Sequence, residues 1–213
     1  MNIELIGEEI PLLEGIRTAR AIRRLKPDPV PIALIRKVCE AGTFAPSGGN
    51  RQPWQFIAVT DRERRAYIAS LYRETFTQYI RPAIEAAKAP DYPEAKRRNM
   101  KAAIYLAEHL HEAPVHLFVA GWTRRGAPQS QALFPAIQNV LLACRAVGLG
   151  ASLTTAHRAH GEAIDRYLGL DPEKTPSIAL IPIGWPKGRF GRPTRRSIDT
   201  CFFENVVPAQ SKD

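Results

Sequence analysis

The sequence predicts one domain, spanning residues 1–213, that combines helices with a few short strands. Three observations support this fold class. The chain has 213 residues, enough for a single full hydrophobic core. Its composition, 45% apolar and 24% charged, is typical of a globular protein. Segments with helical periodicity alternate with short runs rich in β-branched and aromatic residues, and no internal repeat is present.

Two helices and a strand are expected first. Residues Pro11–Arg24 predict a helix with proline near its first turn. In residues 31–42 (PIALIRKVCEAG) apolar side chains recur at helical spacing, and Gly42 is suited to ending that helix. Residues Trp54–Thr60 (WQFIAVT) alternate in polarity and are rich in β-formers, which predicts a strand.

Residues 61–111 are mostly helical in pattern and strongly charged. We expect the helices there to be broken at Pro82, Pro90 and Pro93. Because the stretch is too polar for a central core, it is predicted to be a peripheral helical excursion.

The second half contains the most apolar segments. Strands are expected at residues 114–121, 150–155 and 176–184. Residues 130–147 predict a helix that is apolar on nearly every side, is closed by Gly148 and lies at the centre of the fold. From residue 197 an apolar tail, strand-like only in part, is expected to pack on something, such as a partner subunit.

The chain carries a net charge of +9, with a sequence pI near 9.8. Such a balance fits nucleic acid, an anionic membrane surface or a phosphorylated small molecule. The charge is dispersed in short clusters, and no zinc finger, RNP signature or basic zipper accompanies it. We therefore expect mostly solvated surface charge, a remainder that serves an anionic cofactor, and no nucleic-acid partner.

Neither a membrane span nor a secreted protein is indicated. The apolar runs are too short to cross a bilayer, and the acidic N-terminus lacks the features of a signal peptide. Cys39, Cys144 and Cys201 show no disulfide or zinc-ligand spacing, and the first two fit buried positions in apolar helical patterns. A soluble, cytoplasmic protein without a metal site is expected.

The segment 45–56 (APSGGNRQPWQF) lies between a predicted helix and a predicted strand. Its adjacent glycines permit positive φ and close approach of a ligand. Ser47, Asn50 and Gln52 place hydroxyl and amide groups in the same turn, where they can hydrogen-bond a polar heterocycle and its sugar-like chain. Pro46 and Pro53 stiffen both ends. A polar loop without a special role explains the pattern equally well.

Arginines cluster in two further places. Residues 17–24 (RTARAIRR) hold four arginines near the end of the first predicted helix. Arg20, Arg23 and Arg24 are three or four residues apart, so at least two would share a helical face and can clamp a phosphate. A late Gly/Pro-rich loop carries Arg195 and three more arginines, which can close on the same anion. Solvated basic surface is the alternative in both places.

No set of catalytic side chains accompanies these segments. A nucleophile elbow, HExxH, P-loop, GxGxxG and paired carboxylates are all absent from the sequence. The histidine pairs at 109/111 and 157/160 lack companions at metal-ligand spacing and fit structural roles. A polar turn and arginine clusters without catalytic side chains indicate that a bound cofactor performs the chemistry.

The chain resembles the nitroreductase-like flavoproteins over almost its whole length. Four stretches carry the resemblance in the family's order: residues 20–30 (RAIRRLKPDPV), 45–56, 136–150 (AIQNVLLACRAVGLG) and 181–186 (IPIGWP). The resemblance implies an α+β fold with a central, mainly antiparallel sheet surrounded by helices. It also implies a homodimer with FMN at the subunit interface and a C-terminal extension that packs on the partner.

Residue roles follow from the same resemblance. Arg20, Ala21 and Arg23 would hold the phosphate and ribityl chain of FMN, and Arg195 would close on the phosphate. The ribityl chain and the isoalloxazine would contact Pro46, Ser47, Asn50 and Gln52 of the polar turn, and the other subunit is an alternative source of Gln52. The flavin ring would lie near Leu153, Thr154 and Thr155.

The first motif departs from the family's commonest form. Ala19, Ala21 and Leu25 replace an arginine, a serine and an aromatic residue. The N–H of Ala21 can still serve the cofactor, but the hydroxyl contact is lost, and Arg17 or Arg24 is available to replace the missing charge.

The implied reaction is ping-pong: NAD(P)H reduces FMN, and an electron-poor acceptor such as a nitroaromatic, quinone or activated enone is then reduced. The basic balance favours NADPH. Other branches of the same fold fragment the flavin or remove halogen, and a non-catalytic flavin-binding protein is a further alternative.

Overall fold

Four antiparallel strands form the central sheet of the computed structural model, which describes residues 10–124, 127–128 and 130–207. The strand order is β1–β2–β6–β5, and every neighbouring pair is antiparallel. The strands are β1 (Trp54–Val59), β2 (Val115–Gly121), β5 (Gly150–Ala151) and β6 (Ser177–Gly184), and a separate short ribbon pairs β3 (Thr123–Arg124) with β4 (Ala127–Pro128).

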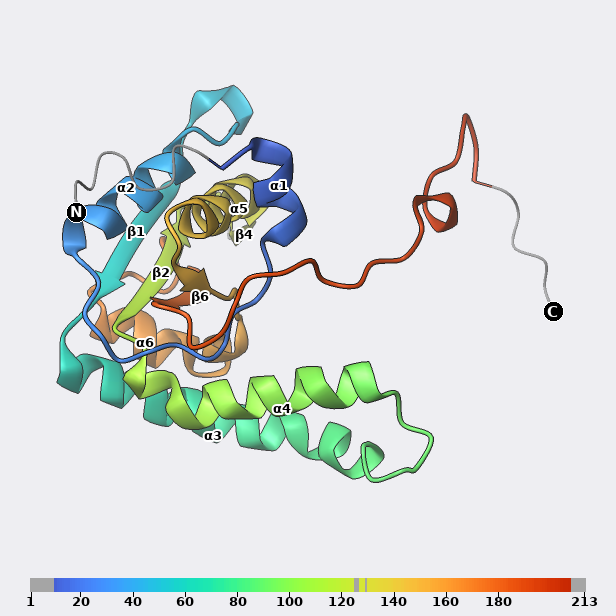
Figure 1. The fold of residues 1–213 in the computed structure, drawn as a ribbon. Helices are drawn as coiled ribbons and strands as arrows, with labels where there is room; N and C mark the ends of the chain where they lie inside the picture. The colour runs from blue at the N-terminus through green and yellow to red at the C-terminus, as the bar shows by residue number, and fades with distance from the viewer. Residues whose placement is uncertain (1–9, 125–126, 129, 208–213) are drawn as a thin grey trace.

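Helices cover the sheet on both faces (Figure 1). The α-helices are α1 (Leu12–Thr18), α2 (Ile32–Thr43), α3 (Arg62–Ala86), α4 (Glu94–His109), α5 (Ser130–Ala146) and α6 (Gly161–Tyr167). Short 3₁₀ turns are η2 (Gly48–Asn50), η3 (Leu110–Glu112), η4 (Ala156–His160) and η5 (Ile198–Thr200). This architecture confirms the predicted α+β fold.

The two central strands explain why both faces need a cover. Every residue of β2 and β6 is buried. Side chains alternate between faces along a strand. Leu117 accordingly lies in a core shared with α2 and α5, whereas its neighbour Phe118 lies in a core shared with α3, α4 and α6. The predicted strands over residues 54–60, 114–121 and 176–184 are confirmed.

The helix predicted over residues 130–147 is confirmed as α5, although it is not enclosed on all sides. Its inner face is buried against α2 and the sheet, while Phe134 and Gln138 are exposed. Gly148 follows with a φ of 77°, the left-handed conformation that ends many helices. Gly42, in contrast, does not end α2. It lies inside the helix, where an added Cβ would be 2.8 Å from Cζ of Phe56, so the glycine allows α2 to approach the sheet.

The first helix is shorter than predicted. α1 ends at Thr18, and residues 20–26 run extended along the sheet edge instead of continuing the helix to Arg24. The Ile22 N–H donates to the Ala151 carbonyl at 2.9 Å, and the Lys26 N–H donates to the Trp185 carbonyl at 2.7 Å. These bonds, with the burial of Ile22 and Leu25, outweigh the local helical tendency. Arg20, Arg23 and Arg24 therefore do not share a helical face.

Residues 61–111 form the long antiparallel pair α3 and α4, which projects beyond the sheet (Figure 1). The predicted break at Pro82 is wrong, because this residue lies inside α3. A proline removes one helical hydrogen bond, and α3 nevertheless continues beyond it to Ala86. The chain does turn between the helices, where Pro90 and Pro93 are found.

Two predicted strands are only partly present. The strand expected over residues 150–155 is limited to β5, followed by an isolated bridge between Thr154 and Leu180. The C-terminal tail, residues 197–207, contains the turn η5 rather than a strand and leaves the body of the molecule (Figure 1). Its apolar side chains, such as Phe202 and Val206, are exposed. Among the described residues, no helix is both long enough and apolar enough to cross a bilayer.

Candidate functional site

A cavity of about 440 Å³ opens where α1, α5 and the end of β5 meet the late Pro/Arg-rich loop. It brings together four of the residues predicted to bind cofactor. Arg20 and Ala21 come from the extended segment after α1, Leu153 follows β5, and Arg195 comes from the late loop. The full lining is Ile16, Ala19, Arg20, Ala21, Gln138, Leu141, Arg145, Leu149, Ala151, Ser152, Leu153, Phe190 and Arg195.

The edge strand β5 determines where residues 20–26, which carry Arg20 and Ala21, lie against the sheet. Gly150 of β5 lies against Ile22 and Leu25, and an added Cβ would be 2.8 Å from a methyl carbon of each. Only glycine allows this approach, which brings residues 20–26 onto β5. On the other side of the segment, the Lys187 N–H donates to the Arg24 carbonyl at 2.9 Å. The arginine-bearing segment is thus anchored to β5 and to the chain that follows β6.

The cavity has a strongly positive lining. Three arginines line it, and none of the described lining residues is acidic. Arg20 donates from Nη2 to the Arg189 carbonyl at 3.2 Å. Arg145 donates from Nε to Thr18 Oγ1 at 2.8 Å, and its guanidinium lies 4.3 Å from the ring centroid of Phe190. Such a set of guanidinium groups suits a phosphate or another anion.

Ser152 adds a polar group that lacks a partner. The residue is 1% exposed and lines the cavity, and its Oγ has no hydrogen-bond partner among the described residues. A buried hydroxyl without a partner costs about 1–3 kcal/mol. A ligand with a hydrogen-bonding group would remove that cost. The lining therefore fits a molecule that is anionic at one end and polar elsewhere.

Arg23, Thr154 and Thr155 were predicted for the same site but do not line this cavity. Arg23 is half-buried beside Tyr72, and burial lowers the pKa of its guanidinium. The Tyr72 hydroxyl lies 3.0 Å from Thr154 Oγ1. Burial raises the pKa of that phenol, so it stays protonated. These residues flank the cavity beyond Leu153, where a second cavity begins.

The turn that holds Pro46, Ser47, Asn50 and Gln52 also lies outside the cavity. Within the turn the Gln52 N–H donates to Ser47 Oγ at 3.0 Å, and Gln52 Nε2 donates to Asn50 Oδ1 at 3.2 Å. Asn50 and Gln52 have φ values of 51° and 49°, which are strained for residues other than glycine. A polar turn held in this conformation at the surface is suited to contact a ligand or a second subunit.

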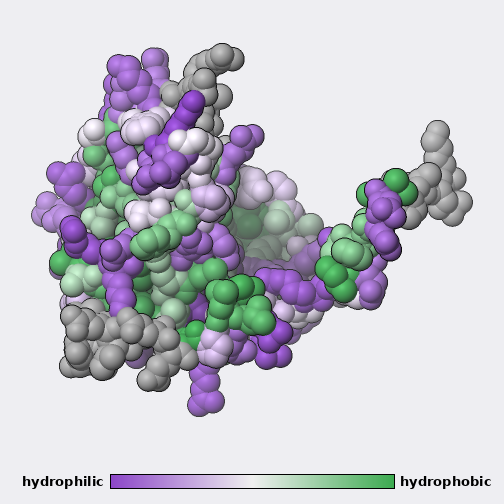
Figure 2. Space-filling model, turned by 90° about the horizontal axis from the view of Figure 1, so that it is seen from above, coloured by the Kyte–Doolittle hydropathy of each residue, from purple (hydrophilic) through white to green (hydrophobic). Residues whose placement is uncertain are grey.

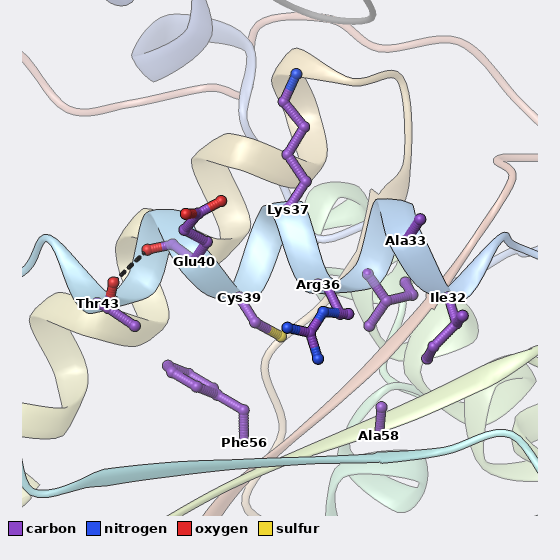
Figure 3. A pocket seen from close by; sticks show the side chains of 10 residues that line it. Ile32, Ala33, Arg36, Lys37, Cys39, Glu40, Thr43, Phe56 and Ala58 are labelled. Atoms are coloured by element: carbon purple, nitrogen blue, oxygen red, sulfur yellow. Dashed lines mark hydrogen bonds between the residues drawn. The ribbon is translucent and has the colours of Figure 1, made fainter. Parts of the chain in front are cut away.

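A larger cavity, about 730 Å³, lies between α2 and the edge strand β1 and contains none of the predicted site residues. Figure 3 shows Arg36 and Cys39 of α2 facing Phe56 and Ala58 of β1 across this space, with Lys37 pointing the other way. Burial raises the pKa of the Cys39 thiol to about 11, so it is not a reactive thiolate. The smaller, arginine-lined cavity is the better site for a charged ligand.

Comparison with known proteins identifies the family. The model of the nitroreductase family matches residues 16–185. The chain belongs to the nitroreductase family.

The 5,6-dimethylbenzimidazole synthase of Rhodospirillum rubrum is 31% identical over 79% of this chain and 78% of that protein. A protein named putative NADH dehydrogenase/NAD(P)H nitroreductase from Archaeoglobus fulgidus is 28% identical over 82% of this chain and 85% of that protein. Among solved structures, a putative nitroreductase in complex with FMN from Desulfovibrio desulfuricans superposes with a TM-score of 0.69, at 27% identity, covering 94% of this chain and 99% of that one.

Several residues that line the arginine-lined cavity were not predicted. Arg145, Gln138 and Ser152 are examples. Arg145 carried a usable signal, because an arginine inside a helix that is otherwise largely apolar needs a polar environment. Ser152 and Phe190 carried none, since a serine after a strand and a phenylalanine in a loop are common in any fold.

Proposed function

We propose that this chain is an FMN-dependent oxidoreductase that uses NAD(P)H to reduce electron-poor acceptors such as nitroaromatics, quinones or activated enones. The observation that carries the proposal is the cavity lined by Arg20, Arg145 and Arg195. Its wall also contains Ser152, whose hydroxyl has no hydrogen-bond partner within the described part of the chain. Membership of the nitroreductase family and the FMN complex of the Desulfovibrio relative support the choice of cofactor.

The lining residues would contact different parts of the cofactor. Arg20, Arg145 and Arg195 would hold the FMN phosphate, because guanidinium groups form charge-assisted hydrogen bonds with it. Ser152 would hydrogen-bond a polar atom of the flavin, and Leu153 would lie against the ring. Arg23, which lies outside the cavity beside Tyr72, would add positive charge near the flavin.

When bound, FMN would supply the redox chemistry between NAD(P)H and the acceptor. The chain itself orients the cofactor and excludes water. Leu149 and Ala151 form a buried apolar part of the wall, which strengthens electrostatic contacts inside the cavity. The basic balance of the chain, a net charge of +9, favours NADPH over NADH, since NADPH carries an additional phosphate.

A homodimer would complete the site. In this proposal Pro46, Ser47, Asn50 and Gln52 of one subunit meet FMN bound mainly by the other, which accounts for their distance from the cavity.

The C-terminal tail would pack on the partner: Figure 2 shows hydrophobic side chains gathered on this projecting segment. A stable monomer rarely leaves such a segment uncovered. The groove along α2 and β1 can take it, because β1 is at the sheet edge and can pair with an added strand.

The test is anaerobic reduction of the FMN-loaded protein. Addition of NADPH or NADH should bleach the flavin absorbance, and a quinone or nitroaromatic should restore it. NADPH should act with the higher kcat/KM. A protein that binds FMN but is bleached by neither nucleotide would be a flavin-binding protein without this activity.

A second reaction is favoured by the Rhodospirillum relative, whose name describes synthesis of 5,6-dimethylbenzimidazole. In a flavin-fragmenting reaction the cofactor is consumed, whereas a reductase recovers it. FMN quantified by chromatography after many turnovers in air separates the two. Full recovery supports the reductase, and stoichiometric loss of FMN with formation of a benzimidazole supports the alternative.

A further inference from the structure

The positive charge of the chain is concentrated on one surface beside the arginine-lined cavity. Residues 17–26 (RTARAIRRLK) and 187–196 (KGRFGRPTRR) hold ten of the 30 lysines and arginines and none of the 21 aspartates and glutamates. The rest of the chain holds the other 20 basic residues and all 21 acidic ones, so it is close to neutral. These two segments, called the basic surface below, therefore account for the whole net charge of +9.

The fold brings the two segments of the basic surface together, although they are far apart in the sequence. The Lys187 N–H donates to the Arg24 carbonyl at 2.9 Å. Arg20 donates from Nη2 to the Arg189 carbonyl at 3.2 Å. Like charges held side by side repel one another and destabilise the folded chain. An anionic partner would offset that repulsion.

Most of this charge lies outside the cavity. Two of the ten basic residues line the cavity, and seven of the other eight are exposed. Two carboxylates offset part of the charge, because Arg192 bonds Glu14 at 3.2 Å and Lys187 lies 3.5 Å from Glu112. A phosphate bound in the cavity would neutralise the lining and leave the surrounding charge available to a larger anionic partner.

The chemistry of the basic surface favours an acidic protein over nucleic acid. Proteins that bind single-stranded nucleic acid combine a basic groove with exposed aromatic side chains. Phe190 is the one aromatic residue in the two segments, and it is half-buried against Ile22 and Leu25. The basic surface also borders the cavity proposed to hold a redox cofactor. Complementary charge steers a protein partner to such a site, and electron-transfer interfaces are small and weak.

We propose that the basic surface docks an acidic electron-carrier protein of the iron–sulfur or flavin class, which is a second electron donor beside NAD(P)H. The proposal rests on the oxidoreductase function proposed above. The balance is two reduced carriers + FMN + two H⁺ → two oxidised carriers + FMNH₂. Each carrier loses one electron, and the protons come from solvent.

Stopped-flow mixing of the FMN-loaded protein with a reduced plant-type ferredoxin, an acidic iron–sulfur protein, tests the docking. The variant Arg189→Glu/Arg196→Glu reverses two exposed charges of the basic surface that do not line the cavity. The matched control Arg81→Glu/Arg98→Glu makes the same change of net charge near the turn between α3 and α4. Photoreduced 5-deazariboflavin, a small uncharged reductant, needs no docking surface.

We expect the second-order rate constant for reduction by ferredoxin to fall at least about tenfold as NaCl rises from about 20 to about 300 mM, because salt screens the attraction. At low salt Arg189→Glu/Arg196→Glu should lower that rate constant about tenfold, and the control variant should match the wild type. 5-Deazariboflavin should reduce all three proteins alike. A rate constant that does not depend on salt, or equal losses in the two variants, would overturn the proposal.

Isothermal titration calorimetry with oxidised ferredoxin gives a readout that does not depend on turnover. The wild type and Arg81→Glu/Arg98→Glu should bind it with the same Kd, and Arg189→Glu/Arg196→Glu about tenfold more weakly. Failure to take up FMN would refute the proposed function, whereas FMN uptake without ferredoxin binding would refute the docking alone. A single-stranded oligonucleotide that binds more tightly than ferredoxin at the same salt concentration would also overturn the proposal.

Discussion

Replacing Arg20 with alanine is the sharpest perturbation of the proposed cofactor site. Arg20 lines the arginine-rich cavity and is held toward the late loop by its bond to the Arg189 carbonyl. Arg17 offers a matched control, because it is exposed on α1, lies three residues earlier and does not line the cavity. Arg20→Ala and Arg17→Ala change the net charge equally.

The size of the effect follows from the geometry. A hydrogen bond to a charged group contributes about 1.5–3 kcal/mol, and each 1.4 kcal/mol changes affinity about tenfold. Arg20 is exposed, and Arg145 and Arg195 remain in the variant. Solvent screening therefore places the expected loss near the lower limit, about tenfold weaker FMN binding for Arg20→Ala.

The assay is quenching of FMN fluorescence by the apoprotein at fixed ionic strength, repeated with riboflavin, which lacks the phosphate. Arg20→Ala should weaken FMN binding about tenfold and leave riboflavin binding unchanged, while Arg17→Ala should alter neither. Equal losses in both variants would indicate a nonspecific charge effect. An unchanged FMN affinity in Arg20→Ala would show that the phosphate is bound elsewhere.

Three further predictions concern stability and assembly. Gly121→Ala places a Cβ 2.9 Å from the Pro53 carbonyl oxygen and 2.6 Å from a methyl carbon of Leu133, so it should lower the free energy of unfolding by about 1–3 kcal/mol in urea titrations. Gly188→Ala, with nothing within 4 Å, should change it by less than about 0.5 kcal/mol. Burial lowers the pKa of His116 and that of His157 to about 4 each, so the unfolded chain binds an extra proton at each of them between pH 4 and 6.5. Each histidine should lower stability by about 3 kcal/mol as the pH drops through that window, and urea midpoints that do not change with pH there would contradict this. Removing the C-terminal tail should convert a dimer to a monomer in sedimentation velocity, and an unchanged mass would contradict the role of the tail.

Much of the fold was predictable because the relevant signals are local. Apolar periodicity located α2 and α5, and runs of β-formers located β1, β2 and β6. The prediction of a helix up to Arg24 was wrong for a physical reason. The extended form of the segment after α1 depends on hydrogen bonds to residues more than 120 positions away, such as that from Ile22 to Ala151. No local pattern reports such a contact.

The candidate site was predictable only in part for a similar reason. Arg20 and Arg195 stood out as members of arginine clusters, and the structure places both on one cavity. Arg145 was hidden in a helix interpreted as core. The turn around Asn50 remains a prediction, because the contacts proposed for it require a second copy of the chain.

Binding of FMN by the chain is tested by the visible absorption spectrum of the purified protein, combined with reconstitution by FMN. We expect a yellow protein, or a colourless one that takes up one FMN per chain with flavin absorption bands shifted from those of free FMN. A colourless protein that takes up no FMN would contradict it.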